Sequence, residues 1–405
     1  MHRLQTLLDN RTARRVLWCL NGIVIALMMW ATRNERSGDH GTYMALADGI
    51  LAGRYSMQSW MHDFIPDTFR TPGFPLYLAG IIKVFGAWQA IQGVQLVLYV
   101  ISLHLMLRII ARFDGSWLTG NIALLCLLPL VNVPYYITQV LPEIPTLACV
   151  TASVYLLTRP YRLSWLNAVA LGLLYGFSFQ CRPVYMLMPP LLALGALWAN
   201  KRSFDLRGHA LAIVVFVITL VPYSMWNKEH HGVFSPTPLE GGGGVMHFGI
   251  WAGAIPDHQE HRYWSNFTGD EIVRFVPEDS VASNIAAYER EWDDVQARLA
   301  PLKTHTDSLM EKAFDHGLCP ARTYNTRYTL ERERLLKEKA KALAAHKPGY
   351  ALAYKSWSAL RLWVIGIQRG NFLEANVLSK VKQLYATLST LFILVLTVTF
   401  SFLAI

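Results

Sequence analysis

Two short stretches, Ser37-Gly38-Asp39-His40 and Arg70-Thr71-Pro72-Gly73-Phe74-Pro75, bracket a polar loop that directly follows the first hydrophobic segment of the chain. Between them lie most of the carboxylates of this region, and Arg70 stands immediately before a Pro-Gly turn. The acidic residues from Ser37 to Pro75 are Asp39, Asp48, Asp63 and Asp67. We interpret the rest of the sequence as a membrane scaffold and a cap built around this loop, which spans residues 33–86.

The stretch from Asp39 to Ala52 has the pattern of an amphipathic helix. Its apolar residues recur at helical spacing, which gives one apolar and one polar face, as expected of a helix lying in a membrane surface. Those apolar residues are Tyr43, Met44, Ala47, Ile50 and Leu51. Asp39 would then occupy the N-cap position, where a carboxylate accepts hydrogen bonds from the first backbone N–H groups. From local sequence alone, Asp39 is equally well explained as a helix cap and as a functional group.

Composition places the chain among integral membrane proteins. Of its 405 residues, 53% are hydrophobic and only 16% are charged, and the mean hydropathy is +0.26, whereas soluble domains carry about 25% charged residues. The five cysteines form neither a paired framework nor a metal-type pattern. The net charge of +9 does not indicate a nucleic-acid partner, because in a membrane protein the placement of the charges matters more than their sum.

Hydrophobic segments predict an all-α polytopic fold with about eight transmembrane helices. The expected spans are Val16–Thr32, 88–107, 117–136, 142–158, 164–180, 183–199, 209–226 and Leu384–Ile405. Residues 72–86 are too short for a crossing of roughly 20 residues, and we interpret them as a re-entrant or interfacial element. With that choice the basic connections fall on the side of the arginine-rich N-terminus, which the positive-inside rule assigns to the cytoplasm.

Three regions follow from this pattern. Residues 1–226 form a membrane domain that contains the loop 33–86, residues 227–349 form a long external segment, and residues 350–405 form a surface helix and a final span. The external segment opens with a glycine run, Gly241 to Gly244, which indicates either a flexible loop or a close backbone approach to a ligand. Leu330 to His346 predicts a solvated helix, and Tyr350 to Ile367 predicts a helix at the membrane surface.

Four ionisable residues fall at the same depth, near the external ends of the predicted spans. They are Asp39, Arg70, Glu143 at the start of a span, and Arg182 at the tip of a helix hairpin. Ionisable groups at membrane depth are costly and usually face a cavity. An alternative is that Glu143 and Arg182 form a purely structural ion pair. The histidines of the external segment have no metal-ligand spacing, so no metal is expected.

Several motifs together resemble the membrane glycosyltransferases of the GT-C fold, especially family 39, which includes dolichyl-phosphate-mannose–protein mannosyltransferases and bacterial aminoarabinose transferases of lipid A. The likeness rests on Asp39 with a Tyr-x-x-x-Ala helix, on the Arg70–Leu76 turn, on Pro142-Glu143, and on Val221–Asn227 followed by the glycine run. The chain departs from many members by having Asp39-His40 in place of Asp-Glu, and by its shorter C-terminal part.

The resemblance implies inverting, metal-independent sugar transfer from a polyprenyl-phosphate lipid to a glycan, lipid or protein acceptor, without a cofactor. Attack by a hydroxyl requires a base, for which Asp39 is the candidate, and Glu143 would orient the acceptor or share that role. Guanidinium groups match phosphate geometry, so Arg70 and Arg182 are expected to bind the donor phosphate. Further contacts to substrate or lipid are expected from His40, Tyr43, Pro72, Tyr185 and His247.

The expected location is the inner membrane of a bacterial cell, with the site facing the periplasm. Two other functions remain open on the sequence alone. A glycan ligase that uses a lipid diphosphate donor would share the overall plan. A lipid or glycan transporter would also place polar groups in a bundle, but its functional ionisable residues are expected at mid-depth and often within an internal repeat, and neither is evident here.

Overall fold

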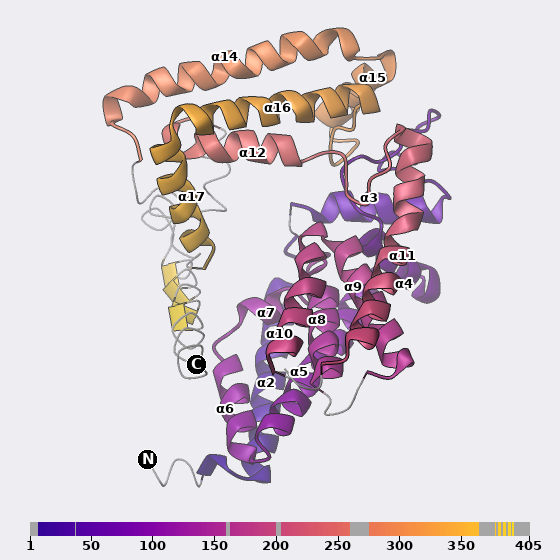
Figure 1. The fold of residues 1–405 in the computed structure, drawn as a ribbon, viewed down its shortest axis with the longest axis vertical. Coiled ribbons are helices and arrows are strands. Elements are labelled where there is room, and N and C mark those ends of the chain that lie inside the picture. The colour runs from indigo at the N-terminus through magenta and orange to yellow at the C-terminus, as the bar shows by residue number, and fades with distance from the viewer. Residues whose placement is uncertain are drawn as a thin grey trace. The chain divides into compact units, whose positions relative to one another are not determined.

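The computed structural model describes residues 7–36, 38–158, 163–199, 204–259 and 275–363, with a few isolated positions between 377 and 392. These described residues contain helices and no strand (Figure 1). The predicted final span, Leu384–Ile405, and the surface helix beyond Trp363 lie outside the described residues, apart from those isolated positions. The chain divides into two compact units, residues 1–238 with 309–323, and residues 239–308 with 324–405.

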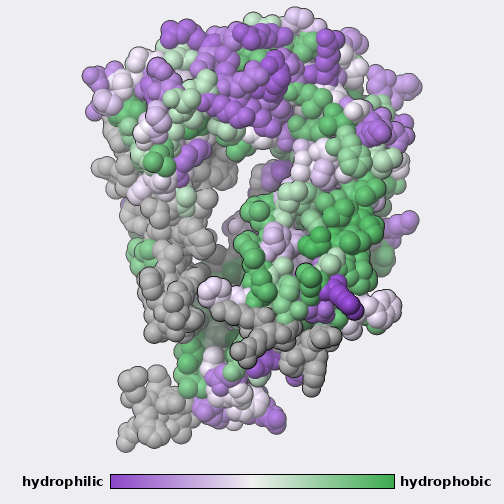
Figure 2. All heavy atoms as spheres, in the orientation of Figure 1, coloured by the Kyte–Doolittle hydropathy of each residue, from purple (hydrophilic) through white to green (hydrophobic). Residues whose placement is uncertain are grey.

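The first unit contains the helices that were predicted to lie in the membrane. In chain order they are α2 (Arg11–Thr32), α3 (His40–Leu51), α4 (Gly73–Phe85), α5 (Ala90–Phe113), α6 (Trp117–Leu127), α7 (Asn132–Tyr135), α8 (Glu143–Leu157), α9 (Trp165–Cys181), the 3₁₀ helix η1 (Pro183–Leu187), α10 (Met188–Ala199) and α11 (Leu206–His231). Three of them, α2, α5 and α11, are long and apolar enough to cross a membrane. Figure 2 shows hydrophobic residues over much of the visible face of these helices.

Several predicted spans differ in their bounds. The predicted span 117–136 is not continuous, since α6 ends at Leu127 and the short α7 follows only after a turn that contains Pro129. Proline lacks the backbone N–H that a helix interior needs. The predicted span 183–199 begins as the 3₁₀ helix η1, again at a proline, and α11 continues past the predicted end at residue 226 to His231. The 13 residues of α4 fall short of the roughly 20 that a crossing needs.

Close packing of α9 against α11 depends on two glycines. A Cβ atom on Gly172 would lie 2.5 Å from the carbonyl oxygen of Ala212, and one on Gly176 would lie 2.0 Å from Thr219 Oγ1. Small residues four apart allow two helix backbones to approach closely. This contact fixes the end of α9, from which Arg182 follows, relative to Tyr223 on α11.

The second unit consists of α12 (Gly242–Trp251), η2 (Ala252–Ala254), η4 (Glu278–Ser280), α14 (Val281–Leu299), η5 (Ala300–Leu302), the start of α15 (His305–Asp315), α16 (Thr326–His346) and α17 (Pro348–Trp363). The prediction of a solvated helix at 330–346 is only partly right. Its exposed positions include Arg334, Lys337, Glu338 and Lys341, but Leu335, Leu336 and Ala340 are buried, because α16 packs against α12 and α14.

Candidate active site

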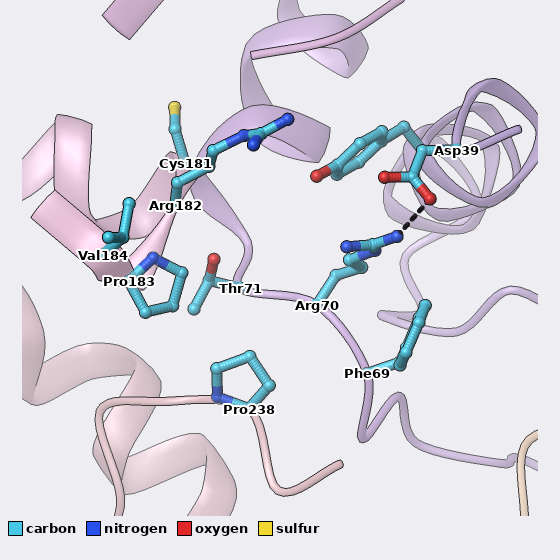
Figure 3. Close-up of a pocket in the computed structure, with 10 residues that line it drawn as sticks. Asp39, Phe69, Arg70, Thr71, Cys181, Arg182, Pro183, Val184 and Pro238 are labelled. Carbon is cyan, nitrogen blue, oxygen red and sulfur yellow. Dashed lines mark hydrogen bonds and ion pairs between the residues drawn. The ribbon is translucent and has the colours of Figure 1, made fainter. Parts of the chain in front are cut away.

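A cavity of about 270 Å³ lies within the first unit, where α2 is followed by α3 and where α9 ends. Figure 3 shows the Arg70 and Arg182 side chains extending toward the side of the cavity on which Asp39 lies. The cavity is lined by Asp39, Tyr43, Phe69, Arg70, Thr71, Cys181, Arg182, Pro183, Val184 and Pro238. Three of the four ionisable residues singled out in the sequence therefore line one cavity, although they are far apart along the chain.

Asp39 stands at the N-cap position of α3, but its side chain does not cap the helix. No hydrogen bond joins its carboxylate to the backbone of the first turn. Instead Oδ1 accepts a hydrogen bond from Nη2 of Arg70 at 2.6 Å, drawn as the dashed line in Figure 3. Of the two explanations that the local sequence allowed, the simple cap is therefore wrong.

The backbone of Arg70 is held by hydrogen bonds on both sides. Its N–H and that of Phe69 donate to Asp67 Oδ2, at 2.8 and 3.1 Å. Its carbonyl oxygen accepts two hydroxyls, from Tyr55 at 2.8 Å and from Tyr223 of α11 at 3.0 Å. These bonds fix the main chain of Arg70 while its guanidinium reaches the cavity.

Arg182 and Glu143 form the second ion pair, between the residue that follows α9 and the first residue of α8. Nη2 of Arg182 donates to Oε1 of Glu143. The other carboxylate oxygen of Glu143 is buried and has no hydrogen-bond partner, and the same is true of Nε of Arg182 and Nε of Arg70. Buried polar atoms without a partner are rare in folded proteins. The site thus holds both donor and acceptor capacity that the protein itself does not use.

Gly73 brings the two arginine-bearing segments together. A Cβ at this position would lie 2.6 Å from both Cβ and the carbonyl carbon of Gln180, so only glycine lets the start of α4 pack against the end of α9. Arg70 lies a few residues before Gly73 in the sequence, and Arg182 lies a few residues after Gln180. The Pro-Gly turn that the sequence marked is therefore the contact that places both guanidiniums at one cavity.

The four charged residues act on the hydroxyl of Tyr43. The pKa of this phenol is raised, mainly by burial; Arg70 and Arg182 lower it, and Asp39 and Glu143 raise it. All four charges therefore lie within Coulombic reach of one hydroxyl. The guanidinium of Arg70 stands 5.0 Å from the centre of the Tyr43 ring, at cation–π distance. Glu143 does not line the cavity, but it belongs to the same charge cluster through Arg182.

The remaining predicted contact residues lie in different surroundings. Tyr43 lines the cavity, whereas His40, Pro72 and Tyr185 are not among its lining residues. His40 bonds through Nε2 to Arg36 at 2.7 Å, and its pKa is lowered mainly by burial and then by Arg36. Pro72 occupies the N-cap position of α4. Tyr185 lies in η1 and packs against the apolar core around α9.

His247 belongs to the second unit and is engaged there in a buried contact. Its ring is 1% exposed and its Nε2 lies 2.9 Å from Glu291 Oε2. The ring stacks on Tyr288, with centroids 5.4 Å apart. Burial raises the pKa of Glu291, but hydrogen bonds from His247 and Trp251 and the charge of Lys339 outweigh that effect and leave it lowered. The structure thus gives His247 a packing role inside the second unit.

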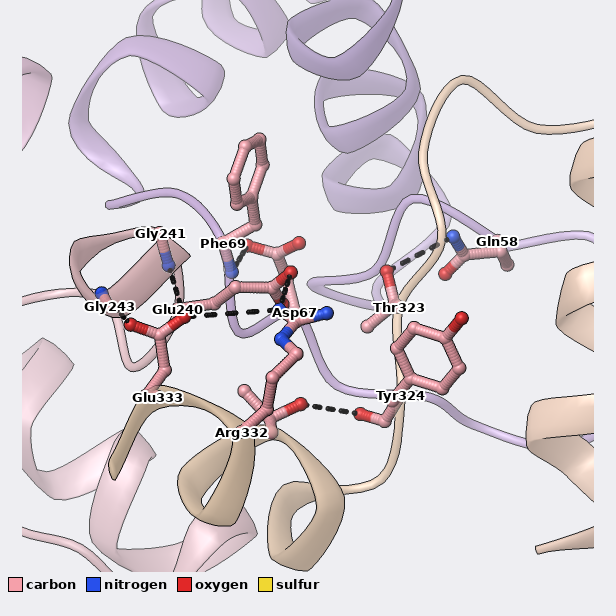
Figure 4. Close-up of polar contacts among 11 residues, drawn as sticks. Gln58, Asp67, Phe69, Glu240, Gly241, Gly243, Thr323, Tyr324, Arg332 and Glu333 are labelled. Atoms are coloured by element: carbon pink, nitrogen blue, oxygen red, sulfur yellow. Dashed lines mark hydrogen bonds and ion pairs between the residues drawn. The ribbon is translucent and has the colours of Figure 1, made fainter. Parts of the chain in front are cut away.

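The glycine run is explained by a close approach inside the protein. Gly241 and Gly243 donate their backbone N–H groups to the carboxylate of Glu333 (Figure 4), and a Cβ on Gly243 would lie 2.5 Å from the Glu333 carbonyl oxygen. Glu333 thus occupies the N-terminus of α12, where a negative charge is favourable. Of the two explanations given from the sequence, close backbone approach holds, and the partner is a side chain of α16.

The sequence did not reveal the supporting residues of the cavity. Tyr55, Tyr223 and Asp67 hold Arg70 in place, and Phe69, Thr71, Cys181, Pro183, Val184 and Pro238 complete the wall. Position offered a partial signal, because Phe69, Thr71, Cys181 and Pro183 are direct neighbours of the two predicted arginines. Within the described ranges no three His, Cys, Asp or Glu side chains are grouped as metal ligands. Comparison of the chain with protein-family models, with curated proteins and with solved structures found no match.

Proposed function

We propose that the protein is a glycosyltransferase of the GT-C type that moves a sugar from a polyprenyl-phosphate lipid to an acceptor hydroxyl on a glycan, lipid or protein. The observation that carries this proposal is the meeting of two carboxylate–guanidinium pairs, Asp39–Arg70 and Glu143–Arg182, at one end of a set of apolar helices. A base and two phosphate-binding groups are what such a transfer requires.

The chemistry assigns each group a step. Asp39 removes the proton of the acceptor hydroxyl as its oxygen attacks the anomeric carbon of the donor sugar, and Glu143 orients that hydroxyl. The bond between the anomeric carbon and the phosphate oxygen breaks on the opposite face, which inverts the configuration. The electron pair of that bond goes to the lipid phosphate, where Arg70 and Arg182 stabilise the growing negative charge.

We further propose a topology in which several helices of the first unit cross a bacterial inner membrane, with the N-terminus in the cytoplasm and the cavity toward the periplasm. Two arginines at the helix ends that lie away from the cavity support this orientation. Arg14 near the start of α2 bonds to Asn121, and Arg112 near the end of α5 bonds to the Tyr155 carbonyl. Basic residues at the ends of spans favour the cytoplasmic side.

The test uses purified full-length protein in lipid discs with a panel of radiolabelled polyprenyl-phosphate sugars, with and without a cell-envelope extract as acceptor. We expect release of the lipid phosphate with one sugar, which names the donor. In Asp39→Asn we expect a loss of about 10²- to 10⁴-fold in rate, the usual contribution of a general base, with an unchanged unfolding temperature. Asp48→Asn removes the same charge from an exposed position of α3 and should stay active.

Each other outcome has a distinct meaning. A fully active Asp39→Asn protein would show that Asp39 is not the base. Tight binding of a polyprenyl-diphosphate glycan, without release from any monophosphate sugar, would favour the ligase. If neither release nor binding occurs, a transporter becomes the better explanation.

A further inference from the structure

Both guanidiniums of the cavity are already occupied by carboxylates of the protein. Nη2 of Arg70 lies 2.6 Å from Asp39, and Nη2 of Arg182 is bonded to Glu143. The N–H groups that bind a carboxylate are the same ones that bind a phosphate, with nearly the same geometry. This inference rests on the proposed function. A donor phosphate that reaches Arg70 and Arg182 must compete with Asp39 and Glu143.

The contacts of Asp39 make such a competition easy. The Asp39 side chain is 45% exposed and has no hydrogen bond to the backbone of α3. Ion pairs with so exposed a partner are weak, so moving the carboxylate away from Arg70 costs little. Water or an acceptor hydroxyl can replace the lost partner.

Arg70, in contrast, is held in place at its main chain. Its N–H is fixed by Asp67 and its carbonyl by the hydroxyls of Tyr55 and Tyr223. Its guanidinium also lies 4.3 Å from the centre of the Phe69 ring and 5.0 Å from that of Tyr43, so we expect the carboxylate to move when the pair separates and the guanidinium to stay. The asymmetry means that the arriving anion finds its binding group already positioned.

Donor capacity that remains unused points in the same direction. Nε of Arg70 and Nε of Arg182 are buried and have no hydrogen-bond partner. A carboxylate has two oxygens, and here each carboxylate engages its arginine through only one of them. A phosphate group presents more acceptor oxygens and can use the N–H groups that Asp39 and Glu143 leave unbonded.

We propose that a lipid phosphate binds in this cavity by exchange, displacing Asp39 from Arg70 and Glu143 from Arg182. The two acids are then released toward the acceptor only when the donor is bound. In the empty site each acid is held by its arginine, which suppresses proton abstraction from stray hydroxyls. The donor therefore binds before the acceptor, and both carboxylates act as internal competitors of the donor.

The test is a binding measurement on full-length protein in lipid discs, with farnesyl phosphate as the probe. Farnesol and inorganic phosphate are the two comparison probes, which separate the lipid part from the phosphate part. Removing an internal competitor should tighten binding, so Asp39→Asn should lower the dissociation constant of farnesyl phosphate roughly two- to fivefold. Glu143→Gln should lower it as well. Affinity for farnesol should not change. Asp48→Asn, which removes the same charge from an exposed position of α3, is the matched control.

The exchange is overturned if Asp39→Asn and Glu143→Gln bind farnesyl phosphate no more tightly than the wild type, or if Asp48→Asn tightens binding equally. It is overturned as well if neither wild type nor variants bind the probe. Failure of the proposed function is separate, since it would appear as absent sugar transfer. Unfolding temperatures of all proteins identify a variant that has lost its fold, and Asp39→Ser then replaces Asp39→Asn. Tightening for inorganic phosphate alone would assign the exchange to free phosphate instead of a lipid headgroup.

Discussion

Arg70 in the first unit and Arg332 in the second make the same kind of contact in different surroundings. Each places Nη2 against a carboxylate oxygen, at 2.6 Å from Asp39 and at 2.5 Å from Glu240. The Asp39 side chain is 45% exposed and faces a cavity, whereas Arg332 and Glu240 are 16% and 10% exposed. Burial lowers the pKa of Arg332, but the charges of Glu240 and Glu333 raise it by more, so that the pKa lies above its ordinary value.

An ion pair alone does not reveal whether it serves stability or binding, and the surroundings of these two pairs differ. Around Arg332 the neighbouring Glu333 bonds to Gly241 and Gly243, and the guanidinium lies 5.8 Å from the Tyr324 ring. The Nε atom of Arg70 has no hydrogen-bond partner, and the Arg70 side chain lines the cavity. A filled network stabilises the fold, and an incompletely bonded pair beside a cavity is available to a ligand.

The largest expected effect concerns the buried pair. Arg332→Leu removes the guanidinium from the buried Arg332–Glu240 ion pair, and breaking a buried pair should lower the free energy of unfolding by about 3–5 kcal/mol. Denaturant unfolding of the full-length protein measures this change. Arg334→Leu in the same helix is the control, because Arg334 is 53% exposed and the loss of its exposed ion pairs with Glu331 and Glu338 should have only a small effect on stability. If the two variants unfold alike, the buried pair is not structural and the comparison fails.

The next effect concerns the cavity pair. Arg182→Ala should weaken binding of the proposed lipid-phosphate donor by roughly 10- to 100-fold, the contribution of a hydrogen bond to a charged group. Titration of the donor into the protein in lipid discs measures it. Arg108→Ala removes the same charge from an exposed position of α5 and should bind normally. Unchanged donor affinity with reduced stability would instead make Arg182–Glu143 a structural ion pair.

A smaller effect tests the glycine contact of the buried network. Gly243→Ala places a methyl group 2.5 Å from the Glu333 carbonyl oxygen, and such overpacking costs about 1–3 kcal/mol. Gly244→Ala is the matched control, since a Cβ there meets nothing within 4 Å and alanine favours a helix by up to about 1 kcal/mol. Equal unfolding temperatures for both variants would show that the close approach is not required.

The smallest effect is a dependence on pH in the second unit. Because the folded protein holds the pKa of Glu291 below its ordinary value of 4.5, the contribution of Glu291 to stability is complete above that pH. It is lost as the pH falls through the lowered pKa. The unfolding temperature, measured at a series of acidic pH values, should therefore fall less steeply with decreasing pH in Glu291→Gln than in the wild type. Parallel curves would remove Glu291 from the buried network.

Local pattern predicted the elements better than their roles. Helical periodicity placed the helix after Asp39, and hydrophobic segments placed the apolar helices α2, α5 and α11, because the positions of these elements depend on neighbours in sequence. Asp39 stands at the predicted N-cap position, but its side chain makes no capping hydrogen bond, because Arg70, which lies 31 positions away, competes with the backbone of the helix end. The sequence around Asp39 could not predict this contact, because Arg70 is not part of it.

The glycine run shows the same limit in the second unit. Its sequence indicated flexibility or a close approach, and the carboxylate of Glu333, which decides between them, lies 90 residues from Gly243. His247 is a further example, since its contact with Glu291 depends on the packing of α12 against other helices. The prolines were more informative locally, and the turn at Pro129 and η1 at Pro183 could have been foreseen from the missing backbone donor.

The order in which the chain is synthesised bears on the assembly of the cavity. The first unit comprises residues 1–238 and also 309–323, so the chain leaves it, makes part of the second unit, and returns. In the returning stretch, Met310, Ala313 and Cys319 pack on Ile65, and Thr323 accepts a hydrogen bond from Gln58. The loop that contains Tyr55 and Asp67 is thus completed late in translation. A ribosome-bound chain that stops before residue 309 carries the carboxylates and arginines of the cavity but lacks the packing that steadies their loop.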